Sequence, residues 1–358
     1  MGKFTVRGSK DPFPSARYPG LLVRLAGPGG FYLSGRSGIW HLGYDGVLKK
    51  AQPLPLPRFR LELARIGLLR RLGRLDVREM VYGPDGYYLA VVEKQIFKWS
   101  EGRNIARRVF QVNDGGHPKG LLATPQGHLF VGEYWGNPNR RPLRVWASMD
   151  QGENWETVYT LPAGRAKHLH NLVWDEHRQG IWVLTGDADH ESALLFTDDG
   201  FRTVSEVARG SQMYRACQVF CRPEGLYYAT DTERAENWFL FLDPGAGQLH
   251  RLQPLPGSCF YAATMAGRHF LSTSVEPSQV NRHNWAALWS SPDLQAWHKV
   301  VEFKKDWWPG EYFGFGSIVL PRVQGETSMV AFSTQALKPY DLTTFIMPLP
   351  RQDEALES

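Results

Sequence analysis

The sequence lacks the marks of several large protein classes. It contains no apolar run of about 20 residues, the length that a membrane-spanning helix needs, so we do not expect an integral membrane protein. Its first residues form no apolar signal-peptide core, which favours a cytoplasmic location. The three cysteines, Cys217, Cys221 and Cys259, make no CxxC pair, and this argues against a zinc ribbon. No Gly-x-Ser-x-Gly pattern indicates a serine hydrolase, and no glycine-rich turn opens a helix of a nucleotide-binding unit.

Excess charge is confined to one segment. The chain has 41 Lys and Arg against 36 Asp and Glu, a net charge of +5. Residues 58–78 hold seven arginines against Glu62 and Asp76, so the rest of the chain is balanced at 34 against 34. On a helix over 58–78, most arginines share one face and leucines the other, which predicts a basic amphipathic helix. Phe59 is its only aromatic residue, so we do not expect nucleic acid as a partner.

Two roles are open for this predicted helix. In the first role, the helix lies at an anionic membrane surface, which would make the protein peripheral at the membrane and its substrate lipid-linked. In the second role, the helix packs on the protein with its arginines in water.

The composition instead favours many short strands. The chain has 36 Gly, 24 Pro, 13 Trp, 14 Tyr and 19 Phe, which is typical of strands joined by tight turns. A weak repeat recurs every 45–50 residues or so, about the spacing of β-propeller blades. We count seven units, with six as the alternative, and expect the strand near 343–348 to close the ring with the N-terminal segment. Residues 1–358 are thus predicted to form one all-β domain, a seven-bladed propeller with one inserted amphipathic helix.

One turn motif carries a family resemblance. Residues 148–155 read Ser-Met-Asp-Gln-Gly-Glu-Asn-Trp, which resembles the Asp-box of the sialidase-like, BNR-repeat β-propellers. Shortened copies occur at 197–201 and 291–297. The resemblance implies the propeller fold and a carbohydrate-processing ancestry. The arginine triad and the early Arg-Ile-Pro motif of true sialidases cannot be placed in the chain, so sialidase activity is not expected.

Polar residues recur at equivalent positions of five consecutive units. In a propeller, the innermost strands line a central channel, and their first residues and the loops after the second strands surround one mouth. We therefore predict a site at this mouth. The candidate catalytic residues are His168, His170, Tyr214, Arg215, Glu133 and Asp187, and the candidate substrate-binding residues are His117, Lys119, Tyr134, Glu191, Gln212, Asp231, Tyr261 and Glu276.

His168 and His170 are two residues apart on a strand, so both side chains point to one face. They are either a metal-binding pair, completed by His117, Gln212 or a carboxylate, or a general base with an orienting imidazole, or structural. As metal ligands, imidazoles with oxygen donors suit divalent Mn, Fe, Ni or Zn.

Arg215 and the acidic residues also have alternative roles. Arg215 either holds a substrate carboxylate or pairs with Asp187 or Asp231 to join two blades. Glycoside hydrolysis needs two carboxylates, which a hydrolase would draw from Glu133, Asp187, Glu191 and Glu276. Aromatic residues that can stack on sugar rings, or belong to the core, are Tyr134, Trp135, Trp238 and Tyr261.

The residue mixture favours a carbohydrate-active enzyme that cleaves an acidic oligo- or polysaccharide. In a polysaccharide lyase, a His or Tyr removes the proton next to a uronate carboxylate that Arg215, Lys119 or a metal neutralises. This lyase is slightly favoured over a glycoside hydrolase. The alternative is a non-catalytic propeller whose mouth binds a glycan or a protein.

Overall fold

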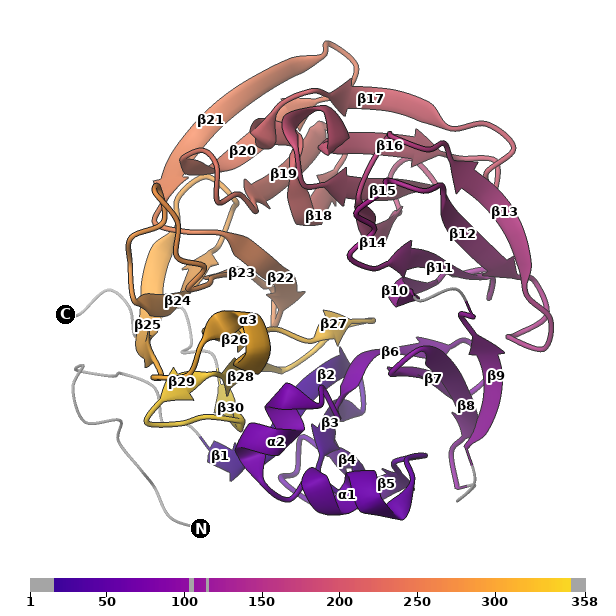
Figure 1. Ribbon diagram of the computed structural model, residues 1–358, viewed down its shortest axis with the longest axis vertical. Coiled ribbons are helices and arrows are strands. Elements are labelled where there is room, and N and C mark those ends of the chain that lie inside the picture. Colours follow the sequence, from indigo (N-terminus) through magenta and orange to yellow (C-terminus); the bar gives the residue numbers. More distant parts are fainter. Residues whose placement is uncertain (1–15, 103–105, 114–115, 349–358) are drawn as a thin grey trace.

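Seven sheets stand in a ring around a central axis (Figure 1). All their strand pairs are antiparallel except β2 with β27. The computed structural model describes residues 16–102, 106–113 and 116–348. The predicted seven-bladed propeller is confirmed, and the six-bladed alternative is excluded.

The blades follow one another along the chain. The first contains β2 (Leu21–Gly27), β3 (Gly30–Gly35), β4 (Gly38–Leu42) and β5 (Leu48–Pro53), and the short β27 (Arg322–Val323) pairs with β2. The second contains β6 (Val77–Gly83), β7 (Tyr87–Val92), β8 (Gln95–Ser100) and β9 (Arg107–Gln111). The third contains β10 (His117–Ala123), β11 (Leu129–Tyr134), β12 (Leu143–Ser148) and β13 (Glu156–Leu161).

The remaining blades repeat this order. The fourth contains β14 (His168–Asp175), β15 (Gly180–Gly186), β16 (Ala193–Thr197) and β17 (Ser205–Arg209). The fifth contains β18 (Ala216–Arg222), β19 (Gly225–Thr230), β20 (Asn237–Asp243) and β21 (Gln248–Leu255). The sixth contains β22 (Cys259–Met265), β23 (Arg268–Thr273), β24 (Trp285–Ser291), β25 (His298–Lys305) and the edge strand β29 (Leu337–Lys338).

The seventh blade joins the two ends of the described chain. It contains β26 (Ser317–Val319), β28 (Met329–Gln335), β30 (Thr343–Pro348) and, outermost, β1 (Ala16–Pro19). Ala16 lies opposite Ile346 and Pro19 opposite Thr343. The N-terminal strand therefore closes the ring, as the sequence predicts.

The core lies between neighbouring blades. Every residue of β7, β15 and β19 is buried, because the second strand of a blade has another blade packed on each face. These strands consequently read as continuous apolar runs rather than alternating ones. Trp182 and Tyr228 are the largest fully buried side chains of this layer.

The three turns that resemble the Asp-box have the hydrogen bonds that their residues suggest. Ser148 Oγ donates to Asp150 Oδ1 at 2.8 Å, and the same oxygen accepts from the Asn154 backbone N–H at 2.9 Å. Gly152 has φ 89°, and the Trp155 indole N–H donates to its carbonyl at 3.2 Å. Asp199 and Asp293 accept from backbone N–H groups of the corresponding turns in the fourth and sixth blades.

The single helix predicted over 58–78 is wrong. The segment forms two short helices, α1 (Arg58–Leu63) and α2 (Gly67–Leu72), and its last residues begin β6. Ile66 has an extended backbone, with φ −94° and ψ 111°, and this breaks the helix between them. Among the described residues, no helix is long and apolar enough to cross a bilayer.

The prediction that the arginines of this segment lie in water is also partly wrong. Arg70 and Arg71 are buried instead of lying in water. Arg70 pairs with Asp76, and Arg71 Nη1 lies 2.5 Å from Asp306 Oδ2 and 2.9 Å from Asp341 Oδ2. Buried guanidinium groups need such partners, and the partners of Arg71 come from the far end of the chain.

Candidate functional site

Strand register places most of the predicted site residues at one end of the channel. The innermost strands β10 and β14 begin at His117 and His168, which lie opposite the last residues of β11 and β15, Tyr134 and Gly186. β18 begins next to Arg215, and its neighbour β19 ends just before Asp231. We call this end the mouth. The mouth brings together His117, Tyr134, His168, His170, Asp187, Arg215, Asp231 and Glu276.

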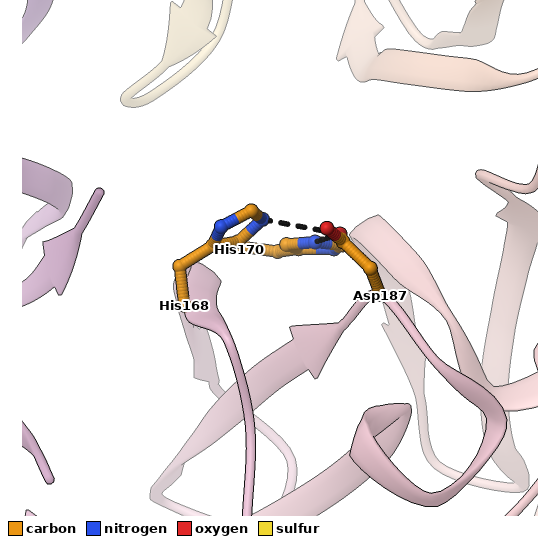
Figure 2. Close-up of side chains that lie close together, drawn as sticks. All are labelled: His168, His170 and Asp187. Atoms are coloured by element: carbon orange, nitrogen blue, oxygen red, sulfur yellow. Dashed lines mark ion pairs between the residues drawn. The ribbon is translucent and has the colours of Figure 1, made fainter. Parts of the chain in front are cut away.

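His168, His170 and Asp187 form a compact group at the mouth (Figure 2). His168 Nε2 lies 3.2 Å and His170 Nε2 3.6 Å from the same atom, Asp187 Oδ1. The strand register shifts between Leu169 and Asn171, so His170 belongs to a β-bulge, a feature that often redirects side chains at functional sites. Both imidazoles are almost completely buried.

The second nitrogen of each imidazole faces a backbone carbonyl. His168 Nδ1 lies 3.2 Å from the Trp135 carbonyl oxygen, and His170 Nδ1 lies 3.0 Å from that of Ala216. All four ring nitrogens therefore have an oxygen neighbour. The role of a free general base, which the sequence left open for these histidines, has little support in this arrangement.

Asp187 is the ionised centre of the group. Burial raises the pKa of Asp187, but the neighbouring His168, His170 and Arg215 outweigh it and hold the pKa well below its usual range. Lys167 Nζ lies 2.6 Å from Asp187 Oδ2, and Arg215 Nη2 lies 3.4 Å from Oδ1.

Arg215 joins the fourth and fifth blades. Besides Asp187, its guanidinium pairs with Glu233 and lies 3.7 Å from Asp231 Oδ2. Asp231 also accepts a hydrogen bond from Cys217 Sγ at 3.2 Å. This is the interblade pairing that the sequence offered as an alternative to substrate binding.

Glu276 is the acid at the mouth with a pKa near neutrality. Burial and the neighbouring Asp231 raise the pKa of Glu276 to about 7, and Glu233 adds to the shift. Ser258 Oγ donates to Glu276 Oε2 at 2.7 Å. A carboxyl with this pKa can either donate or accept a proton at neutral pH.

A group of cations lines the other side of the channel. We call it the basic group, and its members come from the innermost strands of the first three blades and from β27: Arg24, Arg78, Lys119 and Arg322. Glu79 lies among them, with Lys119 Nζ at 3.0 Å. Burial raises the pKa of Glu79, but Lys119 and Arg322 outweigh it and lower the pKa to about 2. Four cations thus surround one carboxylate.

His117 lies beside the basic group and is neutral. Burial and Arg78 lower the pKa of His117 to about 3. Its Nε2 lies 2.7 Å from Arg78 Nη1, so the imidazole accepts from the guanidinium. The Tyr134 ring lies between His117 and His168, with ring centroids 4.9 and 4.1 Å away.

Sequence reasoning found Lys119 but missed the other members of the basic group. Arg24, Arg78 and Arg322 lie within or beside apolar stretches that read as ordinary strands. An arginine on the innermost strand of a blade is the signal that would have identified them, because that edge borders the channel.

Two of the predicted catalytic or binding carboxylates are bound by groups outside the proposed site. Glu133 accepts from the Arg144 backbone N–H at 3.2 Å and pairs with the Arg144 guanidinium. Glu191 pairs with Arg140 and accepts from the N–H groups of Asp187 and Ala188. Both carboxylates are buried and paired with arginines, and neither is part of the proposed site.

Gln212 and Tyr214 stabilise the loop before β18. The Gln212 amide donates to the Asp187 carbonyl at 3.0 Å and accepts from Thr232 Oγ1 at 2.6 Å, so it is not positioned as the metal ligand that the sequence suggested. Tyr214 packs with the apolar cluster around Tyr228. Tyr261 is half-buried on β22.

A groove at the opposite end of the propeller lies away from this chemistry. It has a volume of about 610 Å³ and lies between the third and fourth blades. Its walls are turns at the far ends of the strands from the mouth, including Gln126, Asp198 and Gly200.

No family model and no curated protein matches the chain. Among solved structures, it is similar to an oligogalacturonate lyase in complex with manganese, with a TM-score of 0.62 and 10% identity over 94% of this chain and 91% of that chain. It is also similar to a catalytically inactive virginiamycin B lyase from Staphylococcus aureus with quinupristin, with a TM-score of 0.56 and 12% identity over 94% and 100% of the two chains. A GH74 xyloglucanase from Xanthomonas campestris has a TM-score of 0.53 and 15% identity over 81% of this chain and 47% of that chain. At these identities the likeness defines the class of fold, a β-propeller that also occurs in enzymes.

Proposed function

We propose that the protein is a carbohydrate-active enzyme that cleaves an acidic glycan by β-elimination at the mouth. The observation that carries the proposal is the division of the channel into two sides. The basic group lies on one side, and Glu276, Asp231 and the histidine–aspartate group lie on the other. A uronate substrate needs both, a cationic site for its carboxylate and a carboxylate or imidazole for proton transfer.

The proposed step breaks one C–O bond without adding water. Binding of the uronate carboxylate by Lys119 and Arg24 makes the neighbouring C–H proton more acidic, because the negative charge that develops is neutralised. The ionised Glu276 takes this proton, a double bond forms between that carbon and its neighbour, and the glycosidic oxygen leaves. Glu276 then returns the proton to the leaving oxygen.

Glu276 also favours a second candidate, a glycoside hydrolase. A protonated carboxyl with a raised pKa beside an ionised carboxylate is the arrangement of acid-catalysed glycoside hydrolysis. Here Glu276 would be the acid and Asp231 the partner. The basic group favours elimination, because hydrolysis of a neutral glycan has no use for four cations.

The proposal is tested by mass spectrometry of products from a panel of acidic and neutral oligosaccharides. Elimination gives fragments whose masses add up to that of the substrate, one of them with an unsaturated end, and Lys119→Met abolishes the cleavage. Fragments that have gained water assign the protein as a hydrolase. Intact substrates throughout, with detectable binding, assign it as a glycan-binding propeller.

We also propose that the mouth face docks on an anionic membrane. α1 and α2 connect β5 to β6, and α3 (Gly310–Phe313) connects β25 to β26. Both connections run from the fourth strand of one blade to the first strand of the next, so the three helices lie together on this face (Figure 1). Arg71 Nε donates to the Phe313 carbonyl at 2.7 Å and joins α2 to α3. The exposed apolar residues of this platform are Phe59, Leu63, Ile66, Leu72, Trp307, Trp308, Tyr312 and Phe315. Aromatic side chains mixed with exposed arginines are typical of interfacial membrane binding.

A further inference from the structure

The atoms at the centre of the histidine–aspartate group point at one another. One ring nitrogen each of His168 and His170 and one carboxylate oxygen of Asp187 all lie within 4.8 Å of one another (Figure 2). They come from the start of β14 and from the residue after β15. What lies between these atoms depends on where the imidazole protons are.

Backbone carbonyls fix the imidazole tautomers. A carbonyl oxygen only accepts hydrogen bonds, so the Nδ1 atoms facing Trp135 and Ala216 must carry their hydrogens. Each neutral imidazole then has its lone pair on Nε2. Both lone pairs face Asp187 Oδ1, at 3.2 and 3.6 Å, and that oxygen is itself an acceptor.

Three converging lone pairs require a cation between them. Two protons can supply it, but this buries two imidazolium ions whose rings lie 5.1 Å apart, beside Lys167 and Arg215. A single divalent ion satisfies all three atoms with both imidazoles neutral. Carbonyl groups on the outer nitrogens of metal-bound histidines are a usual second layer of such sites.

We propose that His168 Nε2, His170 Nε2 and Asp187 Oδ1 bind one divalent transition-metal ion of the zinc or manganese class. Metal bonds of about 2.0–2.2 Å place neighbouring ligand atoms roughly 3.0–3.5 Å apart. The two distances from Asp187 Oδ1 are close to this range. Two imidazoles and one carboxylate leave further coordination positions open toward the channel.

The surroundings are built to hold this arrangement. Lys167 bonds the other carboxylate oxygen, Oδ2, and so leaves Oδ1 for the ion. A Cβ atom at Gly186 would lie 2.6 Å from Cε1 and 2.9 Å from Nε2 of His170, so only glycine fits there. The positive charge of Arg215 is offset by Glu233 and Asp231. The inference does not depend on the proposed reaction, because it concerns binding alone.

The test measures metal bound to the full chain. After removal of metals with a chelator, the protein is titrated with Zn²⁺ or Mn²⁺ by calorimetry, and bound metal is counted by mass spectrometry of the elements. We expect one ion per chain. His168→Gln and Asp187→Asn should each weaken binding at least tenfold.

Two matched controls use neighbouring residues that are not ligands. His117→Ala removes another imidazole of the mouth, and Cys217→Ser removes the thiol beside His170, so both should bind metal as the unaltered chain does. Circular dichroism checks folding, and if Asp187→Asn does not fold, His168→Gln decides. No bound ion in the unaltered chain, or equal binding by the ligand variants, would overturn the inference.

Product analysis on the same samples separates this inference from the proposed function. Metal binding without cleavage of any glycan contradicts the proposed function and leaves the metal site standing. Cleavage by chelator-treated protein that binds no metal on titration supports the proposed function and contradicts the metal site.

Discussion

Glu276 shares a half-buried space with Asp231, Glu233 and the guanidinium of Arg215. Three carboxyl groups near one guanidinium cannot all ionise without cost, so one of them keeps its proton to a higher pH. Glu276 is that group, since it is the one that burial and Asp231 shift to a pKa of about 7.

This pKa makes the pH profile diagnostic. Elimination needs the ionised form of Glu276, so kcat/KM should rise through about pH 7 and then level off. Hydrolysis with Glu276 as the acid needs the protonated form, so kcat/KM should fall through the same pH. Glu276→Gln should remove the transition and lower the rate at least 100-fold.

The same group should affect stability. The folded pKa of about 7 lies above the ordinary value of 4.5, so between these values the folded chain holds a proton that the unfolded chain loses. The free energy of unfolding should therefore fall as the pH rises from 5 to 8, by about 1–3 kcal/mol. Glu276→Gln should lack this part of the pH dependence in denaturant unfolding, and an unchanged dependence would contradict the raised pKa.

Single residues were predictable where the local pattern has chemical meaning. The His-x-His pattern placed His168 and His170 on one face from spacing alone. The hydrogen-bond partners of Glu133 and Gln212 decide their roles, and local spacing does not reveal these partners. For the same reason the basic group was missed: Arg322 reaches the first blade from the end of the chain.

At the scale of elements, α1 and α2 show how a distant contact overrides a helical pattern. The sequence periodicity placed arginines outward and leucines inward over 58–78. Instead, Arg71 is anchored by Asp306 and Asp341, more than 230 residues away. This rotates part of the apolar face outward, and Phe59 is 64% exposed.

The outward apolar face predicts binding to vesicles. Phe59→Ser combined with Trp307→Ser removes two exposed aromatic side chains, of which Trp307 is 85% exposed, so folding should be unaffected. We expect the unaltered chain to float with anionic vesicles at low salt and the double variant to bind at least tenfold less. Added salt should weaken binding, because the exposed arginines contribute electrostatically.

A matched control lies at the other end of the propeller. Val47→Ser removes an exposed apolar side chain from the turn between β4 and β5, and should leave vesicle binding unchanged. No flotation of the unaltered chain at low salt would contradict the membrane proposal. Concentration-dependent self-association that the double variant abolishes would instead identify the platform as a protein interface.

At the scale of the whole molecule, the repeat made the fold predictable. Each blade reads as a local pattern of strands and turns, and the number of units sets the size of the ring. The closure by β1 was also predictable, because an unpaired last blade would expose a sheet edge. The arrangement of charged side chains around the channel was not predictable, because each blade supplies only one or two of them.

Ring closure is itself testable by truncation. Chains that begin at residue 16 and at residue 20 differ by β1 alone, which pairs with β30 over four residues. Loss of this ladder should lower the free energy of unfolding by about 2–4 kcal/mol, from backbone hydrogen bonds worth about 0.5–1.5 kcal/mol each. The shorter chain should also aggregate on heating, because the freed edge of β30 can pair with another molecule. Equal melting temperatures of the two chains would show that the seventh blade is stable without its N-terminal strand, and that β26, β28 and β30 suffice to hold the ring together.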